Sequence, residues 1–95
     1  MTETREEFVD SPYEEPATPL ESSVARIAAQ VLGVDRIGRC DNLYDFGATS
    51  MQAIRICARI EREADCRALP IWLFESDCLA DFVGQLQGQG ERARG

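Results

Sequence analysis

Ser50 is the residue of this chain best placed to do chemistry, because its hydroxyl comes directly before a helical pattern. It ends the segment Asp-Asn-Leu-Tyr-Asp-Phe-Gly-Ala-Thr-Ser at residues 41–50. Helix N-termini hold unpaired N–H groups and partial positive charge, so a serine there is well suited to carry a phosphate ester. Local chemistry also allows a simpler role, in which Ser50 or Thr49 is only an N-cap worth about 1 kcal/mol.

The residue types that are missing exclude several other chemistries. The chain has no histidine and no lysine, which excludes a Ser-His-Asp triad, a Cys-His dyad, an imidazole metal ligand and a Schiff-base lysine. No Cys-x-x-Cys pair occurs among the four cysteines, so a zinc ribbon or a thioredoxin-like motif is not expected. They stand at positions 40, 57, 66 and 78. We therefore expect neither an enzyme nor a metal site.

The charge of the chain limits the classes of partner that we expect, and its N-terminal composition indicates where in the cell the protein is found. The net charge is −7, and residues 1–15 carry six acidic side chains and one arginine. No basic face offsets this charge, which argues against nucleic-acid binding. The acidic start is unlike a signal peptide and no apolar run could span a membrane, so we expect reduced thiols, a cytoplasmic location and no membrane contact. We expect a monomer that binds larger proteins.

Length and composition predict one small domain with polar ends. A chain of 95 residues has room for a single domain. Residues 1–16 are typical of a disordered acidic leader, and a docking tail that uses Phe8 and Tyr13 is the alternative. The folded domain is expected at residues 17–87, followed by a flexible polar tail at residues 88–95.

The first helix and the loop after it follow from capping and spacing. Thr18, Pro19 and Glu21 form a capping-box pattern, and Gly33 is the expected C-cap. Between them, apolar residues recur on one helical face. The long loop at residues 33–49 is expected to be pinned to the core by spaced apolar side chains, namely Val34, Ile37, Leu43, Tyr44 and Phe46.

The second helix is expected from Met51 to about Ala64, with two faces of different character. Ala53, Ile56, Cys57, Ile60 and Ala64 share the face that should point inward. Met51, Ile54 and Ala58 lie on another face, near arginines. They fit either a wide core face or a contact with a partner.

The rest of the chain predicts two more helices. Pro70 opens a short one, and Ser76 or Asp77 should cap the last. Nothing alternates with period two over a useful length, so no strand is expected. The prediction is an all-α, small four-helix bundle of three main helices and one short helix.

The order of these segments resembles the carrier (thiolation) domains of nonribosomal peptide synthetases, in the acyl carrier protein superfamily. The resemblance covers roughly residues 17–86. It includes Val-Leu-Gly-Val at 31–34, the Asp…Phe-Gly approach to Ser50, the arginines of the second helix, and Leu-Phe-Glu at 73–75. The familiar site of this family reads Gly-Gly-(His or Asp)-Ser-Leu, whereas this chain has Gly-Ala-Thr-Ser-Met at 47–51.

The resemblance implies a peptidyl carrier protein with 4′-phosphopantetheine bound covalently at Ser50. A separate phosphopantetheinyl transferase and its Mg²⁺ would attach the group, and its thiol would hold an aminoacyl thioester. Adenylation, condensation, tailoring and thioesterase enzymes or domains would be the further partners. The resemblance also points to Met51 and Ile54 as contact residues, with Arg55 nearby. Trp72 is the next candidate, because a lone tryptophan on a short surface helix is a plausible anchor, although core packing fits Trp72 equally well. Asp41 and Asp45 would contact the transferase or lie as solvated loop acids.

Two further questions stay open at the level of sequence. The initiating methionine and polar ends favour a free-standing protein over a slice of a larger synthetase. A polyketide or aryl acyl carrier protein is an alternative with different cargo. A helical protein–protein interaction module with an unmodified Ser50 is an alternative of another class.

Overall fold

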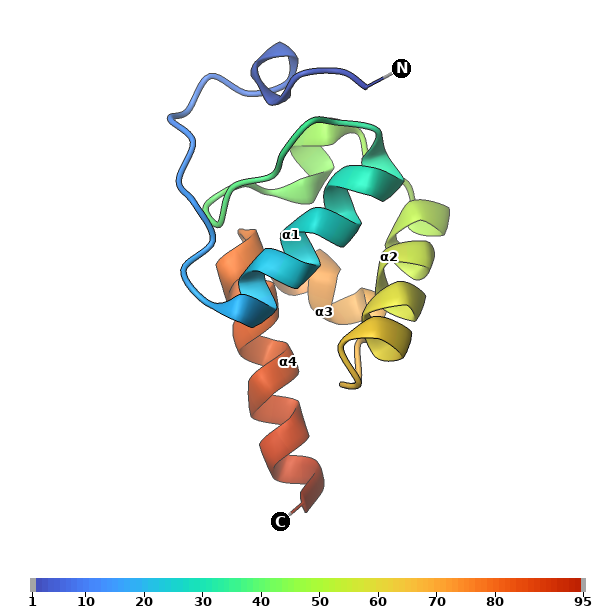
Figure 1. The fold of residues 1–95 in the computed structure, drawn as a ribbon. Helices are drawn as coiled ribbons and strands as arrows, with labels where there is room; N and C mark the ends of the chain where they lie inside the picture. The colour runs from blue at the N-terminus through green and yellow to red at the C-terminus, as the bar shows by residue number, and fades with distance from the viewer. Residues whose placement is uncertain (1, 95) are drawn as a thin grey trace.

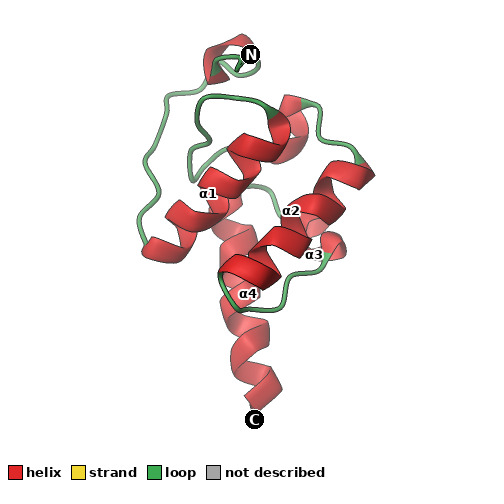
Figure 2. Ribbon diagram, turned by 45° about the vertical axis from the view of Figure 1, so that its right-hand side comes forward, coloured by secondary structure: helices red, strands yellow, loops and turns green. Residues whose placement is uncertain are grey.

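The computed structural model describes residues 2–94, with side chains described as far as residue 88. Four α-helices follow one another, α1 (Pro19–Leu32), α2 (Ser50–Glu63), α3 (Pro70–Glu75) and α4 (Leu79–Arg94), and are joined by loops (Figure 1). Two short 3₁₀ turns, η1 (Arg5–Glu7) and η2 (Leu43–Phe46), precede α1 and α2. Within the described residues there is no strand (Figure 2). A single bridge joins Glu3 and Val34. The all-α four-helix prediction is confirmed.

α1 begins and ends where the sequence predicts. Thr18 Oγ1 accepts a hydrogen bond from the Glu21 amide at 3.0 Å, with Pro19 in the first turn. Glu21 Oε1 accepts from the Ala17 amide at 2.8 Å, one residue further back than in a capping box. Gly33 ends the helix with φ of 74°, a left-handed conformation that glycine adopts without steric cost.

The loop between α1 and α2 is pinned to the core, as expected. Val34, Ile37, Leu43 and Phe46 are all buried. The loop is also tied to the start of α4, because the Leu79 amide donates to the Asp41 carbonyl and the Ala80 amide to the Arg39 carbonyl, both at 2.9 Å. The turn η2 inside this loop was not predicted, since four residues are too few to show a period.

α2 has the two faces that its spacing predicts. Ala53, Ile56, Cys57 and Ile60 are buried, and Ala64, just past the helix end, is half-buried. The opposite face is exposed, so a wide core face does not explain Met51 and Ile54. A hydrophobic inner face with charged residues opposite is what makes a short helix stable in a bundle.

α3 and α4 correct one prediction about capping. α4 begins at Leu79, so neither Ser76 nor Asp77 is its N-cap. Ser76 Oγ instead donates to the Trp72 carbonyl at 2.7 Å, which satisfies a backbone acceptor at the end of α3. At its C-terminal end, α4 continues to Arg94, through residues that the sequence predicts to be a flexible tail.

The core lies where the four helices meet. α1 packs against α2 and α4, and α3 packs against α2 and α4. The most deeply buried side chains of this core are aliphatic or aromatic, and each contributes about 1.5–3 kcal/mol by its burial. They include Val24, Ile27, Ile56, Ile60, Leu79 and Phe82. Trp72 belongs to the same cluster, with 9% of its surface exposed.

Residues 3–14, which we call the N-terminal strap, run along the loop between α1 and α2. Figure 1 shows this blue segment crossing the end of the molecule where the loop lies. The sequence predicts a disordered leader here, which stays a prediction. In the structure Arg5 is 1% exposed and binds Asp41, a partner too distant in sequence for any local pattern to show. Residues 1 and 95, the outer ends of the predicted leader and tail, lie outside the described residues, and the domain boundaries stay predictions.

No helix among the described residues is both long enough and apolar enough to cross a membrane. The same part of the chain holds no group of three or more cysteine, aspartate or glutamate side chains that could bind a metal ion.

Candidate functional site

Ser50 is the first residue of α2, and its neighbour Thr49 is the N-cap. Thr49 Oγ1 accepts from the Gln52 amide at 3.2 Å, and Gln52 Oε1 accepts from the Thr49 amide at 2.9 Å, which completes a capping box. Ser50 is exposed, and its hydroxyl forms no hydrogen bond with any group that the structure describes. Of the two alternatives for capping that the sequence left open, the structure therefore assigns the cap to Thr49.

The start of α2 suits a phosphate group. The capping box uses the amides of Thr49 and Gln52, and the amides of Ser50 and Met51 between them have no partner among the described residues. The first turn of α2 has no acidic side chain, whereas that of α1 contains Glu21. Free amides and the positive end of the helix dipole favour an anion. A phosphodiester on Ser50 Oγ thus fits the residues present.

The approach to Ser50 is fixed by a short turn. η2 is capped by Asn42, whose Oδ1 accepts from the Tyr44 amide at 2.8 Å, and it ends at Gly47 with φ of 78°. This positive φ is why glycine stands at position 47. Phe46, buried directly before Gly47, packs the turn on the core four residues before Ser50.

Asp41 and Asp45 occupy different environments. Asp45 is exposed, as a loop acid or a contact residue would be. Asp41 is only 3% exposed, and its carboxylate accepts bonds from Arg5 and from the Gly38 amide. Asp41 is thus neither a solvated acid nor available to a transferase, which corrects both roles that the sequence suggested for it.

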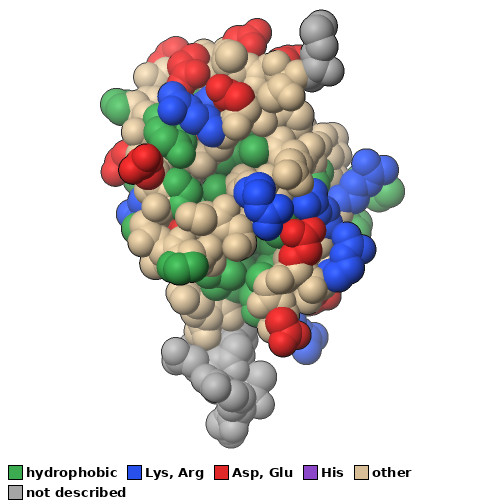
Figure 3. All heavy atoms as spheres, viewed as in Figure 1, with side chains coloured by type: hydrophobic (Ala, Val, Ile, Leu, Met, Phe, Trp, Pro, Cys, Tyr) green, Lys and Arg blue, Asp and Glu red, His purple; other side chains and the backbone are tan. Residues whose placement is uncertain are grey.

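The predicted contact residues on α2 are exposed. Met51 is 62% exposed and Ile54 is 50% exposed, and they lie three residues apart on one helical face with exposed Arg55 beside them. Figure 3 shows several basic side chains on the side of the molecule where α2 lies, with acidic ones among them, and further acidic ones near the N-terminal segment. The outer face of α2 therefore combines apolar and basic groups.

On α3, the sequence suggests Trp72 as a contact residue, but the exposed apolar residues are two others. Trp72 is buried in the core, so core packing is the alternative that its position favours. Ile71 and Phe74 are 55% and 49% exposed. Sequence reasoning missed them as surface residues, although their spacing of three places them on one helical face. Phe74 stacks on Tyr44 with ring centroids 5.0 Å apart, which joins this face to the loop that leads to Ser50.

The four cysteines are not part of this site. All are free thiols, and Cys57 is a buried core residue, as its position on the inner face of α2 predicts. Burial raises the pKa of Cys57 to about 11, so this thiol is protonated at neutral pH.

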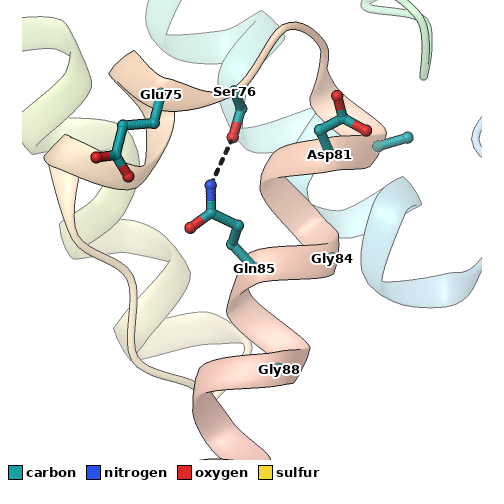
Figure 4. Close-up of a pocket in the computed structure, with 7 residues that line it drawn as sticks. Glu75, Ser76, Asp81, Gly84, Gln85 and Gly88 are labelled. Carbon is teal, nitrogen blue, oxygen red and sulfur yellow. Dashed lines mark hydrogen bonds between the residues drawn. The ribbon is translucent and has the colours of Figure 1, made fainter.

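An open groove elsewhere in the fold contains none of the candidate residues. It lies between the end of α3 and α4 and is lined by Glu75, Ser76, Asp81 and Gln85, with Gly84 and Gly88 along α4 (Figure 4). Gln85 Nε2 donates to Ser76 Oγ at 3.3 Å, so two of the polar groups in the groove bind each other.

Comparisons with known proteins match most of the chain. A family model described as a phosphopantetheine attachment site matches residues 22–86, a range that includes Ser50. Malpinin synthetase of Mortierella alpina is 31% identical over 83 residues, which is 87% of this chain and 1% of that protein. Tyrocidine synthase 2 of Brevibacillus parabrevis is 32% identical over 81 residues, 85% of this chain and 2% of that protein. The chain therefore spans only a small fraction of these relatives.

Solved structures share the fold over a larger part of their length. An active-site mutant peptidyl carrier protein matches with a TM-score of 0.75 at 26% identity, over 85% of this chain and 90% of that one. The complex of the phosphopantetheine transferase Sfp with coenzyme A and a peptidyl carrier protein matches at 0.73 and 28%, over 80% and 99%. BlmI, a type-II acyl carrier protein from Streptomyces verticillus involved in bleomycin biosynthesis, matches at 0.68 and 28%, over 74% and 84%.

Proposed function

This chain belongs to the phosphopantetheine attachment site family and is a carrier domain of the nonribosomal peptide synthetase type, and from that premise we propose that Ser50 carries 4′-phosphopantetheine. The observation that supports Ser50 most directly is its free, exposed hydroxyl at the first position of α2. Thr49, the adjacent hydroxyl, is engaged in the capping box and is the less suitable acceptor.

The chain contributes a nucleophile and a binding place to the attachment reaction. With a phosphopantetheinyl transferase and Mg²⁺, Ser50 Oγ loses its proton and forms a bond to phosphorus of coenzyme A, from which adenosine 3′,5′-bisphosphate leaves. The free amides of Ser50 and Met51 would hold the resulting phosphodiester. The helix dipole adds about 0.3–1 kcal/mol to this binding.

The attached group supplies a thiol on a flexible arm, which holds an aminoacyl group as a thioester and raises its effective concentration at each partner enzyme. The protein's own part in the shuttle is to be recognised. Met51, Ile54 and Arg55 on α2 are the proposed contacts, because an apolar pair with a neighbouring charge is exposed there. We propose the transferase, an adenylation enzyme, and condensation, tailoring or thioesterase enzymes as partners.

Intact mass measurement tests the attachment. The purified protein is incubated with coenzyme A, Mg²⁺ and a broad-specificity phosphopantetheinyl transferase, and we expect a gain of one phosphopantetheinyl group. Ser50→Ala should gain none, while keeping its helix content because Thr49 supplies the cap. Thr49→Ala, the matched control, should still be modified. An unmodified wild type would leave only a helical interaction module.

The cargo is tested separately, on the modified protein. We propose an aminoacyl cargo because solved structures that match with TM-scores of 0.75 and 0.73 include peptidyl carrier proteins. Loading is compared between adenylating enzymes with candidate amino acids and acyltransferases with acyl–coenzyme A substrates. Loading by acyltransferases alone would favour a polyketide carrier, and loading with aryl acids alone would favour an aryl carrier.

We further propose that the protein is free-standing, monomeric and cytoplasmic. The match to most of the length of a type-II acyl carrier protein supports a discrete carrier, whereas the curated relatives are far longer than this chain. Immunoblotting of the producing cells measures this directly. A band near 10.6 kDa in the cytoplasmic fraction is expected, and a band of several hundred kilodaltons would show a larger synthetase.

A further inference from the structure

The N-terminal strap is bonded to the loop that leads to Ser50 at several separate points. At its start, the Glu3 amide donates to the Gly33 carbonyl at 2.9 Å, and the Asp35 amide donates to the Glu3 carbonyl at 2.8 Å. At its end, the Arg39 amide donates to the Glu14 carbonyl at 2.9 Å. The strap thus follows the loop from the end of α1 to the residue before Cys40.

Close packing accompanies these bonds. A Cβ on Gly38 would come within 2.9 Å of the Glu14 carbonyl, so glycine is needed where the strap crosses the loop. The ring centroids of Phe8 and Phe46 lie 5.5 Å apart, and Phe46 is the core residue directly before Gly47. The strap therefore contacts the turn that delivers the chain to α2.

One buried ion pair joins the two segments. Arg5 Nε and Nη2 donate to the two carboxylate oxygens of Asp41 at 2.6 and 2.7 Å, and the two side chains are 1% and 2% exposed. The hydrogen bond to Asp41 also raises the pKa of Arg5. A bidentate pair of this kind fixes the direction of both side chains, whereas removal of one partner leaves a buried charge without compensation.

Asp41 transmits this restraint to the loop. The oxygen that accepts from Arg5 Nε also accepts from the Gly38 amide at 2.8 Å. The Asp41 carbonyl accepts from the Leu79 amide at the start of α4. Arg5, Gly38 and α4 therefore meet at one residue, which stands two positions before η2 and nine positions before Ser50.

We infer that Arg5 is a positioning residue for Ser50, because its buried pair with Asp41 holds the N-terminal strap on the loop and sets the geometry of the turn before α2. This inference rests on the proposed function, since the geometry matters only if Ser50 is modified. The strap then contributes to the modification of Ser50 by orienting it.

Kinetics of phosphopantetheine transfer test the inference in the full chain. Arg5→Gln, Asp41→Asn and the double variant form a cycle, with kcat and KM measured separately under conditions where circular dichroism shows each protein folded. We expect kcat/KM to fall on the order of tenfold in either single variant, because the nucleophile is less well oriented. The double variant should be no worse than the worse single variant, since both act through one pair.

Two further variants separate positioning from general loss of stability. Arg26→Gln, on α1, removes an exposed ion pair with Glu63 at the end of α2 and leaves the Arg5–Asp41 pair intact, so it should leave kcat/KM unchanged. Arg5→Lys keeps the charge but not the fork of two bonds, and should recover part of the lost rate. It also serves as the test variant if Arg5→Gln does not fold.

Amide hydrogen exchange provides the second readout. In Arg5→Gln, exchange of amides in residues 38–47 should rise on the order of tenfold, while the amides of Phe82 and Val83 in α4 stay protected. Unchanged kcat/KM in folded Arg5→Gln, or effects that add in the double variant, would overturn the inference and leave the proposed function intact. A wild type that is not modified would overturn both.

Discussion

Two adjacent hydroxyls, on Thr49 and Ser50, have different uses in this protein. Thr49 bonds to the Gln52 amide and so completes the helix, which leaves the Ser50 hydroxyl exposed and free. The resemblance made Thr49 a departure from the family pattern, where histidine or aspartate is familiar. Its structural role explains how the start of α2 tolerates the change, because threonine is a good N-cap.

Glu21 is the side chain at which we predict a measurable dependence on pH. It is 5% exposed, and Arg39 donates to both its carboxylate oxygens, at 2.9 and 3.1 Å. Hydrogen bonding from Arg39, and then from the Ala17 amide, holds the pKa of Glu21 below its usual 4.5. At neutral pH, Glu21→Gln should therefore lower the free energy of unfolding by about 1–3 kcal/mol.

The sign of the effect follows from linkage. The contribution of Glu21 is fully present above the unfolded-state pKa near 4.5 and is lost as the pH falls through the lower folded-state pKa. Urea unfolding of both proteins across this range should show the difference shrinking in acid. Glu15→Gln, an exposed control, should stay within about 0.5 kcal/mol of the wild type throughout. A Glu21→Gln difference that does not change with pH would contradict the assignment.

At the scale of the element, α2 separates stability from recognition by face. Ile56 is fully buried, whereas Ile54, two residues earlier on the same helix, is 50% exposed. In a helix with 3.6 residues per turn, a step of two residues moves a side chain to nearly the opposite face. The same residue type therefore serves the core at one position and the surface at the other.

This pair of isoleucines allows a matched test. Ile54→Asp should reduce transfer to partner enzymes while leaving helix content and the free energy of unfolding nearly unchanged. Ile56→Asp should unfold the domain, because it places an unpaired charge in the core. Circular dichroism and loading assays on both variants measure this. Loss of the fold in Ile54→Asp would show that its face is not a surface, and full activity of the folded variant would remove it from the contact set.

At the scale of the whole molecule, the strap packs the N-terminal segment against the loop between α1 and α2. It adds contacts of long sequence separation to a bundle whose remaining packing joins α1 with α2 and α4, and α3 with α2 and α4. In Figure 1 the strap lies at one end of the molecule and α4 extends from the other, so the two ends of the chain are far apart. The loop between α1 and α2, which leads to Ser50, lies beside the strap (Figure 1).

Limited proteolysis with trypsin tests whether the strap is folded. Cleavage after Arg5 requires its buried guanidinium to leave Asp41, so we predict that this bond is cut much more slowly than in a peptide of residues 1–16. Asp41→Asn should raise the rate of cleavage at Arg5 on the order of tenfold. Equal rates in the folded protein and in the peptide would restore the disordered leader that the sequence predicts.

The amino-acid pattern was sufficient for those features that depend on neighbours along the chain. Thr18 is the N-cap and Gly33 the C-cap of α1, as predicted, and the inner face of α2 is buried. The all-α bundle is confirmed as well. Capping and helical period are local properties, which is why the sequence could predict them. The order of motifs also led to the family. Ser50 as the attachment residue stays a proposal, drawn from the same local pattern.

Other features depend on where distant segments meet in space. Arg5 and Asp41 each look like surface charges in the sequence, and only their contact across the fold makes both of them buried. Trp72 and Phe74 stand two residues apart on a helix of a turn and a half, too short for its period to show which one faces inward. The packing of α3 between α2 and α4 settles that choice, because burial is a property of the assembled helices.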